Sequence, residues 1–180
     1  SFFFCKGLDI LRTGGTLTFI TSDKWLDRGY GSDLQEVFLT RSNLKSIIAN
    51  RTKRSFVEAD ITTSITTVEK GDHNSQRLRG SPRFISCSDP YSQIITPKNI
   101  SSLLYRECKK EAKYRAESLH VTTEDYARII SMNATSLWRL GGGQVGENGL
   151  EGSNELTPQG NYSGDKWGSM CLRAPDSVYE

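Results

Sequence analysis

The stretch LRTGGTLTFITSDKWLDRGYGSDL (residues 11–34) decides how the chain folds. Two adjacent glycines lead into TLTFIT (16–21), a β-rich apolar run without a polar face, which is typical of a strand covered on both sides. The run ends abruptly in SDKW (22–25), and a glycine-hinged loop, GYG (29–31), follows. Ligands of doubly wound sheets lie outside the carboxyl ends of the strands. This junction is therefore the first place where we expect a functional site.

Hydrophobic periodicity on both sides of the junction predicts an α/β layer with a terminal antiparallel hairpin. The predicted elements are helices over 2–12 and 33–41 and strands over 44–49 and 61–69. Gly14 lies where a left-handed C-terminal cap would end the first helix. Ser32 and Gln35 match the capping box that opens a helix. The gap between the last two strands is short, which favours antiparallel pairing.

The chain changes character after Lys70. Residues 71–98 are polar and contain three prolines, which predicts a loop or irregular connection. Residues 100–118 and 123–138 are predicted to be helical. Residues 141–164 contain eight glycines, a density typical of a linker or a long loop.

Composition and cysteine spacing exclude several classes of protein. The chain has 180 residues and a net charge of +2, and no apolar run approaches the roughly 20 residues that span a bilayer. The four cysteines, Cys5, Cys87, Cys108 and Cys171, are far apart and form no CxxC pair, which argues against a zinc site and a disulfide framework. We therefore expect reduced thiols in a cytoplasmic protein and no metal site.

Three motifs have ordinary explanations. GGGQVG (141–146) satisfies GxGxxG, but no predicted strand precedes it and no predicted helix follows, so a pyrophosphate would find no helix N-terminus. DPY (89–91) is typical of a turn. His73 and His120 have neither metal-ligand spacing nor a paired nucleophile, so we interpret both as solvated histidines.

The first 70 residues resemble a known family. FFFCKGLDILRTGGTLTFITSDKWLDRGYGSDLQEVFL (2–39), followed by SFVEADITTSITTVEK (55–70), resembles the rear half of the catalytic domain of type IIG restriction-modification methylases, which are adenine-N6 DNA methyltransferases. The family idiom is a helix, Pro-Gly-Gly, a strand ending in Thr-Ser-Asn-Lys-Trp/Phe-Leu, and Gly-Tyr-Gly. Here Thr13 replaces the proline and Asp23 the asparagine. KWGSMCLRAPDSVYE (166–180) is similar to the segment that leads these proteins into their target-recognition domain.

The resemblance implies a partial Rossmann-like methyltransferase sheet and a division of the chain. The expected parts are the rear half of the catalytic domain (1–70), a loop and helical insertion (71–140), a glycine-rich linker (141–164) and the start of the target-recognition region (165–180). The family binds S-adenosylmethionine at a glycine-bearing first strand and turn, and it activates the adenine amine with Asn-Pro-Pro-Tyr. Neither motif occurs in this sequence. We therefore expect both to precede residue 1, with the missing N-terminal half of the catalytic domain, and the chain alone to be inactive.

The resemblance also implies substrate-binding residues. Ser22, Asp23 and Lys24 would line the rim of the pocket that receives an adenine flipped out of double-stranded DNA. Phe56 matches the family position whose ring stacks on that base. Two alternatives stay open: Phe56 as a core phenylalanine, and simple rim packing for Lys24 and Trp25.

A run of basic residues lies beside the predicted strand ends. Arg41, Lys45, Arg51, Lys53 and Arg54 occur with no acidic residue between them. Such a run is commonly a solvated face, but at this place it could hold a polyanion. We expect the last three to contact the DNA backbone without sequence preference.

These patterns together are interpreted as a fragment of a site-specific DNA adenine-N6 methyltransferase of a restriction-modification system. One alternative is a non-catalytic DNA-binding remnant of the same ancestry. The other is an unrelated α/β nucleotide-binding protein, which would be favoured if the residues upstream of Ser1 proved unlike a methylase.

Overall fold

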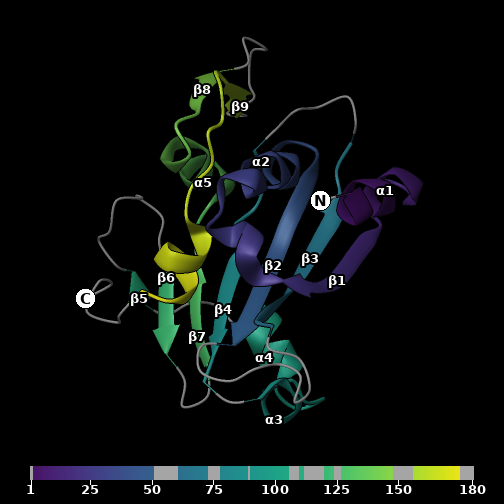
Figure 1. Ribbon diagram of the computed structural model, residues 1–180, viewed down its shortest axis with the longest axis vertical. Coiled ribbons are helices and arrows are strands. Elements are labelled where there is room, and N and C mark those ends of the chain that lie inside the picture. The colour runs from purple at the N-terminus through teal and green to yellow at the C-terminus, as the bar shows by residue number, and fades with distance from the viewer. Residues whose placement is uncertain are drawn as a thin grey trace.

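The chain folds as an α/β layer around one mixed sheet (Figure 1). A computed structural model describes residues 2–50, 61–72, 78–88, 90–105, 110–111, 120–123, 127–147 and 156–174. The sheet strands are β1 (Thr16–Ser22), β2 (Ser42–Asn50), β3 (Thr63–Lys70), β4 (Arg83–Cys87), β5 (Lys110–Glu111), β6 (His120–Thr123) and β7 (Ala127–Ser131). The α-helices are α1 (Phe2–Ile10), α2 (Ser32–Thr40), α3 (Tyr91–Ile94), α4 (Ile100–Tyr105) and α5 (Ala134–Leu140). Three short turns, η1 (Asp23–Leu26), η2 (Gly29–Gly31) and η3 (Gly168–Leu172), and a separate hairpin, β8 (Gln144–Glu147) with β9 (Leu156–Gln159), complete the described part.

β3 organises the sheet, whose strand order is β1-β3-β2-β4-β7-β6-β5. It lies between β1 and β2 and runs antiparallel to both, with Ser22 opposite Thr63 and Ala49 opposite Ser64. β1 and β2 therefore point the same way, and their carboxyl ends reach the same edge of the sheet. β4 extends the sheet by pairing parallel to β2, and β7 pairs antiparallel to β4. The predicted strands over 16–21, 44–49 and 61–69 thus lie in one sheet, and the predicted antiparallel pairing of the last two is confirmed.

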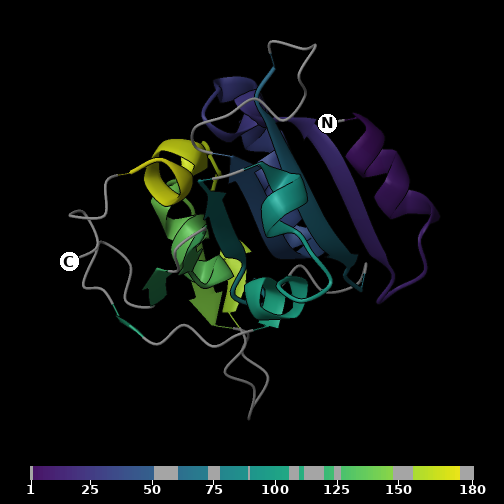
Figure 2. The ribbon, with the colours of Figure 1, turned by 90° about the horizontal axis from the view of Figure 1, so that it is seen from below.

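Helices cover the two faces of this sheet unequally. α1, α2, α5 and η3 contribute to the larger core, which contains Phe4, Phe38 and Phe84. α3 and α4 cover a smaller core on the other face, which contains Ile94 and Leu103 (Figure 2). The predicted packing of the first two helices on the sheet is therefore confirmed.

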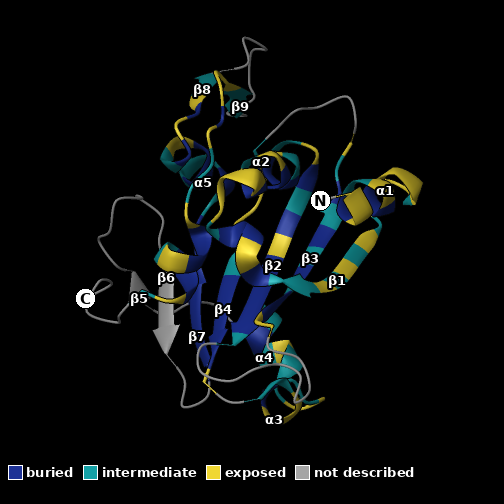
Figure 3. Ribbon diagram, viewed as in Figure 1, coloured by how far each residue is buried: buried dark blue, intermediate teal, exposed yellow. Residues whose placement is uncertain are grey.

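An isoleucine row crosses the second face at one register position. Ile20, Ile65, Ile48, Ile85 and Ile129 are successive partners across β1, β3, β2, β4 and β7. The last three belong to the core under α3 and α4, whereas Ile20 is 48% exposed. Figure 3 shows the same change, from buried central strands to an exposed β1. The second face is therefore open toward β1.

The predictions for residues beyond Lys70 are partly wrong. The predicted loop over 71–98 contains β4, which adds to the sheet. Of the described residues in the predicted helix over 100–118, Ile100–Tyr105 form α4, whereas Lys110–Glu111 form the strand β5; the predicted helix over 123–138 contains β7 followed by the shorter helix α5. All five residues of β7 are buried, because β4 and β6 pair with both its edges and helices or turns cover its faces. An apolar run with this burial has no helical face, so periodicity alone misassigned it.

The left-handed glycine predicted after the first helix is present, but it serves the strand rather than the helix. α1 ends at Ile10, and Gly14 has φ of 76° in the turn before β1. Its N–H donates to the carbonyl of Lys70 at 2.9 Å, which starts the pairing of β1 with β3. Among the described residues, no helix has the length and apolar character needed to cross a membrane.

The glycines at 141–143 are packing residues. Trp138 and Tyr162 stack with ring centroids 4.9 Å apart, and Gly141 and Gly143 lie directly against these rings. α5 precedes the GxGxxG match and β8 begins within it, which is the reverse of the strand–turn–helix order that holds a pyrophosphate. The described part of the predicted linker thus contains the β8–β9 hairpin, which contacts α5 and lies at one end of the molecule (Figure 1).

The contact at Gly143 gives a test of this packing. A Cβ there would overlap the indole of Trp138, whose Nε1 donates to the Gln144 carbonyl at 2.7 Å. Gly143→Ala should therefore lower the free energy of unfolding by about 1–3 kcal/mol, as overpacking does. Gly29→Ala is the matched control, because a methyl group at Gly29 would meet no atom within 4 Å. Urea denaturation of both variants checks the difference, and equal stability would show that the segment is not packed.

Candidate functional site

The carboxyl end of β1 forms a polar rim, as the sequence predicts. Ser22 ends the strand, and its Oγ accepts a hydrogen bond from the Lys24 N–H at 3.5 Å. η1 then turns the chain, so that Lys24 is exposed while Asp23 and Trp25 are buried. The structure brings Ser22, Asp23 and Lys24 together at this end, and their role toward a substrate stays a prediction. We call residues 23–31 the rim loop.

The carboxylate of Asp23 is fully engaged by protein groups. Asp23 is only 6% exposed. Its Oδ1 accepts a hydrogen bond from Thr62 Oγ1 at 2.6 Å, and its Oδ2 lies 3.3 Å from Arg173 Nη1. Asp23 therefore supports the rim from below, and its role toward a substrate stays a prediction.

Arg173 joins the rim loop to the last described segment, 165–174. Its second terminal nitrogen, Nη2, pairs with Asp27 Oδ2, and the Ser169 N–H donates to Asp27 Oδ1 at 2.7 Å. We call this ion-pair cluster of Arg173, Asp23 and Asp27 the clasp. No sequence pattern indicates it, because its partners are separated by about 150 residues.

Trp25 is part of the core beneath the rim. Its ring makes edge contacts with Phe38 at 5.5 Å and with Trp167 at 6.2 Å, and Trp167 contacts Phe84 at 5.8 Å. Trp25 is 5% exposed and Trp167 is 0% exposed. The rim-packing alternative is therefore confirmed for Trp25, whereas Lys24 stays free to face a ligand.

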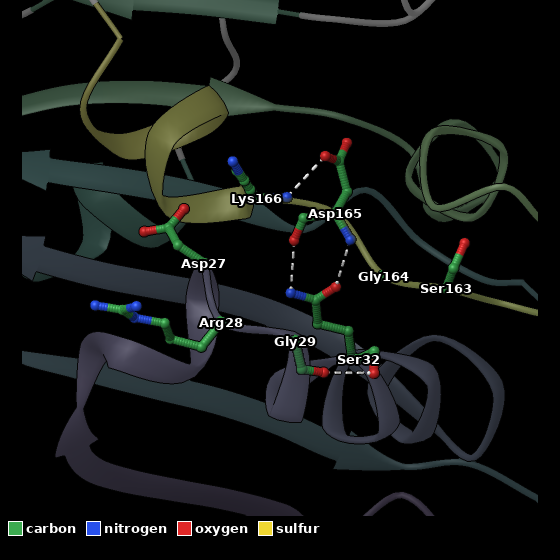
Figure 4. Close-up of a pocket in the computed structure, with 9 residues that line it drawn as sticks. Asp27, Arg28, Gly29, Ser32, Ser163, Gly164, Asp165 and Lys166 are labelled. Atoms are coloured by element: carbon green, nitrogen blue, oxygen red, sulfur yellow. Dashed lines mark hydrogen bonds between the residues drawn. The ribbon is translucent and has the colours of Figure 1, made fainter.

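A pocket of about 260 Å³ lies between the rim loop, the start of α2 and residues 163–166 (Figure 4). Its lining residues are Asp27, Arg28, Gly29, Ser32, Gln35, Ser163, Gly164, Asp165 and Lys166. A Cβ at Gly164, which has φ of 83°, would come within 2.7 Å of Ser32 Cβ. The segment after β9 therefore passes against the start of α2 at a distance that only glycine allows.

Gln35 fastens this segment to α2. Its Nε2 donates to the Asp165 carbonyl at 2.9 Å, and its Oε1 accepts from the Asp165 N–H at 3.0 Å and from the Tyr162 hydroxyl at 2.9 Å. Gln35 is 1% exposed. Burial raises the pKa of the Tyr162 hydroxyl, and the Asp165 charge raises it further, so the phenol remains a donor at neutral pH. The predicted capping box is wrong in its chemistry, because Gln35 binds a distant segment and Ser32 Oγ donates to the Gly29 carbonyl at 2.8 Å.

The exposed charges of the rim are cationic. Lys24, Arg28 and Lys166 are exposed, and none of them forms an ion pair within the described part of the chain. Arg28 and Lys166 line the same pocket. No sequence pattern indicates this pair, since the two residues lie far apart in the chain. Free cations at a rim are the groups that phosphates of nucleic acids bind.

The predicted residues of the basic run divide into two groups. Lys45 pairs with Glu69 at 3.0 Å, and Arg41 follows α2. Both lie at the opposite edge of the sheet from the rim. Phe56, Arg51, Lys53 and Arg54 lie outside the described residues. Before them, Asn50 ends β2 at the rim edge, and after them Thr62, the second described residue, binds Asp23 there.

The buried thiols are poor nucleophiles. Burial raises the pKa of Cys87 to about 12 and also raises the pKa of Cys171. Cys108 lies outside the described residues. Among the residues that are described, no three His, Cys, Asp or Glu side chains come close enough together to hold a metal ion. The rim is thus the best candidate for function in the described part.

Comparison with known families points to the same region. The profile of the family described as Eco57I restriction-modification methylase matches residues 1–56. That range contains α1, β1, the rim loop, α2 and β2. The match relates the rim and its surrounding elements to restriction-modification methylases. A search of curated proteins found no match.

Among solved structures, the chain is similar to the M protein of the type I restriction enzyme EcoKI (M.EcoKI), at 16% sequence identity and a TM-score of 0.43. The match covers 68% of this chain and 29% of that chain. The chain therefore spans less than a third of the M protein. A TM-score of this size is too low to establish a common fold.

The bridge made by Gln35 can be tested by substitution. Gln35→Leu keeps the volume but leaves the Tyr162 hydroxyl and both backbone groups of Asp165 without a partner, so we expect a loss of about 3 kcal/mol in the free energy of unfolding. Glu36→Gln, at the exposed neighbouring position, should stay within about 0.5 kcal/mol of the parent sequence. Chemical denaturation measures both. A stable Gln35→Leu variant would contradict the proposed bridge.

Proposed function

We propose that this chain is part of a site-specific DNA adenine-N6 methyltransferase of a restriction-modification system, of the type IIG kind. In this proposal, residues 1–70 are the rear half of a Rossmann-like catalytic sheet that receives an adenine flipped out of double-stranded DNA. The observation that carries it is the methylase profile match over residues 1–56, because that range contains β1, the rim and the glycine-hinged loop. Residues 165–180 are proposed as the approach to the target-recognition region.

The order of the strands supports the proposal. β3 runs antiparallel between β1 and β2, so two parallel strands end at one edge, where ligands of such sheets bind. Polar residues gather at the end of β1 on this edge, and the flanks of 51–60 lie beside them. We propose that residues 51–60, whose described neighbours lie at the rim edge, carry the base-stacking residue.

The free side of β1 supports a catalytic sheet that continues beyond it. Within the described residues β1 pairs only with β3, so its other edge has unpaired backbone groups. Ile20 on β1 and Phe2, Phe3 and Ile10 on α1 are exposed large apolar side chains. We propose that the N-terminal half of the catalytic domain covers this side in the parent enzyme.

The described residues between β1 and α2 do not fit the family's site for S-adenosylmethionine. The buried Trp25 packs beneath the connection from β1 to α2, and a Cβ at Gly31 would already overlap the Trp25 carbonyl, so the glycine at this turn serves internal packing. Neither of the family's cofactor and amine-activating motifs occurs in the sequence. We therefore assign the S-adenosylmethionine site to another part of the parent enzyme.

The proposed roles of the rim residues follow from their exposure. Lys24 faces outward and is the rim residue we propose to contact the substrate nucleotide. Ser22 orients it by accepting the Lys24 N–H. Asp23 holds the turn in place through Thr62 and Arg173. This division replaces the simple expectation that all three side chains touch the base.

The non-catalytic alternative, a DNA-binding remnant, differs in one measurable respect: it binds DNA but transfers no methyl group. Incubating the full-length parent with S-adenosylmethionine labelled in its methyl group and with double-stranded DNA tests this directly. The proposal requires label at the N6 position of adenine. Label that is absent while DNA is bound would favour the remnant, and an absence of both would favour an unrelated nucleotide-binding protein.

Phe56 is proposed as the residue that stacks on the flipped adenine. Base–aromatic stacking is worth about 1–3 kcal/mol, so Phe56→Ala in the parent should slow methylation about 5- to 150-fold. Phe56→Trp should keep much of the activity, because a larger ring still stacks. Methylation rates and melting temperatures of both variants are the measurements.

A core phenylalanine would give the reverse result. In that case Phe56→Ala would lose about 3–5 kcal/mol of stability, and Phe56→Trp would suffer from overpacking. An early-melting Phe56→Ala together with an impaired Phe56→Trp would refute the stacking role.

Arg51, Lys53 and Arg54 are proposed to contact the DNA backbone. Replacing all three by glutamine in the parent should weaken DNA binding and reduce the slope of log K against log salt by up to about three phosphate contacts. Lys45→Gln is the control, because Lys45 pairs with Glu69 at the opposite edge of the sheet. Binding titrations at several salt concentrations check this. An unchanged slope would assign the three residues to a solvated face.

A further inference from the structure

Arg173 holds both carboxylates of the rim loop at once. One terminal nitrogen lies 3.3 Å from Asp23 Oδ2, and the other pairs with Asp27 Oδ2. Asp23 begins η1 and Asp27 directly follows it, so a single guanidinium fixes both ends of the turn that presents Lys24. We propose that Arg173 is the positioning residue of the rim, and that the direction of Lys24 depends on it. The consequence for catalysis rests on the proposed function.

Burial makes this contact decisive for Asp23. The Asp23 side chain is 9% exposed, and apart from Arg173 only the Thr62 hydroxyl binds its carboxylate among the described residues. Removing the cation would leave a buried charge without compensation, which is strongly unfavourable. The Arg173 side chain is 41% exposed, so its own charge stays hydrated. Loss of Arg173 would therefore destabilise the rim loop, whereas loss of the Asp23 carboxylate would leave the Arg173 charge hydrated.

The backbone around the clasp is shaped to admit the guanidinium. A Cβ at Gly168 would overlap Arg173 Nη2 and would lie 2.5 Å from Asp27 Oδ2, so a side chain there would displace the ion pair. The Ser169 N–H, next in the chain, donates to the same carboxylate at 2.7 Å. Segment 165–174 thus gives Asp27 both a charge and a backbone donor.

The segment that carries Arg173 is itself anchored to the sheet. Arg128 of β7 donates to the carbonyls of Leu172, at 2.9 Å, and Ala174, and Ser86 of β4 donates to the Leu172 carbonyl at 2.6 Å. Trp167 is completely buried. Arg173 therefore extends from a fixed base and, together with the Ser169 N–H and the Trp25–Trp167 contact, ties the rim loop to the segment anchored on β4 and β7.

Asp23 gives a way to test the charge itself. Asparagine is the residue of the motif that this stretch resembles, and its side-chain oxygen can still accept the Thr62 hydrogen bond. An asparagine at this position has no buried charge for Arg173 to neutralise, and Arg173 would still form its ion pair with Asp27. Asp23→Asn should therefore be tolerated, and it should suppress the effect of removing Arg173.

The experiment uses the full-length protein that contains this chain, with R173Q, R173K, D23N and D23N/R173Q. Hydrogen exchange of the amides at 23–31 reads the position of the rim loop directly. We expect exchange in R173Q to be about tenfold faster at 23–31, while D23N stays near the parent rate. In D23N/R173Q the exchange rate at 23–31 should return most of the way to the parent rate. In R173K the rate should lie between those of the parent and R173Q, because one ammonium cannot hold both carboxylates. R139Q, which removes an exposed arginine on α5, should change nothing.

Methylation kinetics give the second measurement. R173Q should raise the KM for DNA by about three- to tenfold with a smaller change in kcat, and D23N/R173Q should reverse part of that rise. The inference is overturned if R173Q lowers only the melting temperature while exchange at 23–31 and the KM stay unchanged, or if D23N fails to suppress R173Q. If R173Q does not fold, R173K and D23N/R173Q decide by the same criteria. A parent that methylates no DNA refutes the proposed function, and the exchange measurement then decides the role of Arg173.

Discussion

The antiparallel insertion of β3 between β1 and β2 is the constraint on which the rest of the structure depends. Because β3 opposes both neighbours, β1 and β2 end at one edge, and α2 carries the chain back along the sheet between them. Lys70 lies at the end of β3, and its ammonium donates hydrogen bonds to the carbonyls of Asp9 and Leu11 at 3.0 and 2.6 Å. This fixes the last turn of α1 at the opposite edge. β3 thereby sets the position of both ends of β1, and with them the rim.

A second constraint comes from the end of the described chain. Aromatic edge contacts run from Phe38 through Trp25 and Trp167 to Phe84, so they connect α2, the rim loop, segment 165–174 and β4. Edge-to-face pairs of this kind prefer defined geometry, which holds the four elements in one arrangement. The rim is therefore built from both halves of the chain, although the methylase profile matches only residues 1–56. Residues outside that match, above all Trp167 and Arg173, complete the site.

The sequence predicted β1, α2, β2 and β3 because each has a local signal: an apolar run or a helical repeat beside glycines. It placed the rim correctly for the same reason. It did not predict β4 and β7, because five-residue strands are defined by their neighbours in the sheet and carry little periodicity of their own. Gln35 was assigned to a local cap, whereas its partners, Tyr162 and Asp165, are about 130 residues away. The clasp was not predicted, because residues that pair across such a distance in the sequence form no local motif.

The clasp also changes what the rim offers to a ligand. In the sequence, the stretch from Asp23 to Arg28 has balanced charge, because Asp23 and Asp27 offset Lys24 and Arg28. In the folded chain Arg173 binds both carboxylates, whereas Lys24 and Arg28 of the rim loop and the neighbouring Lys166 are exposed and form no ion pair within the described part. The stretch is therefore neutral when its charges are counted in the sequence, but its exposed charges in the fold are basic. A basic rim is compatible with a phosphate backbone, whereas two free carboxylates beside it would repel one. The charge that makes the difference comes from the far end of the chain, which is why the rim can be understood only together with segment 165–174.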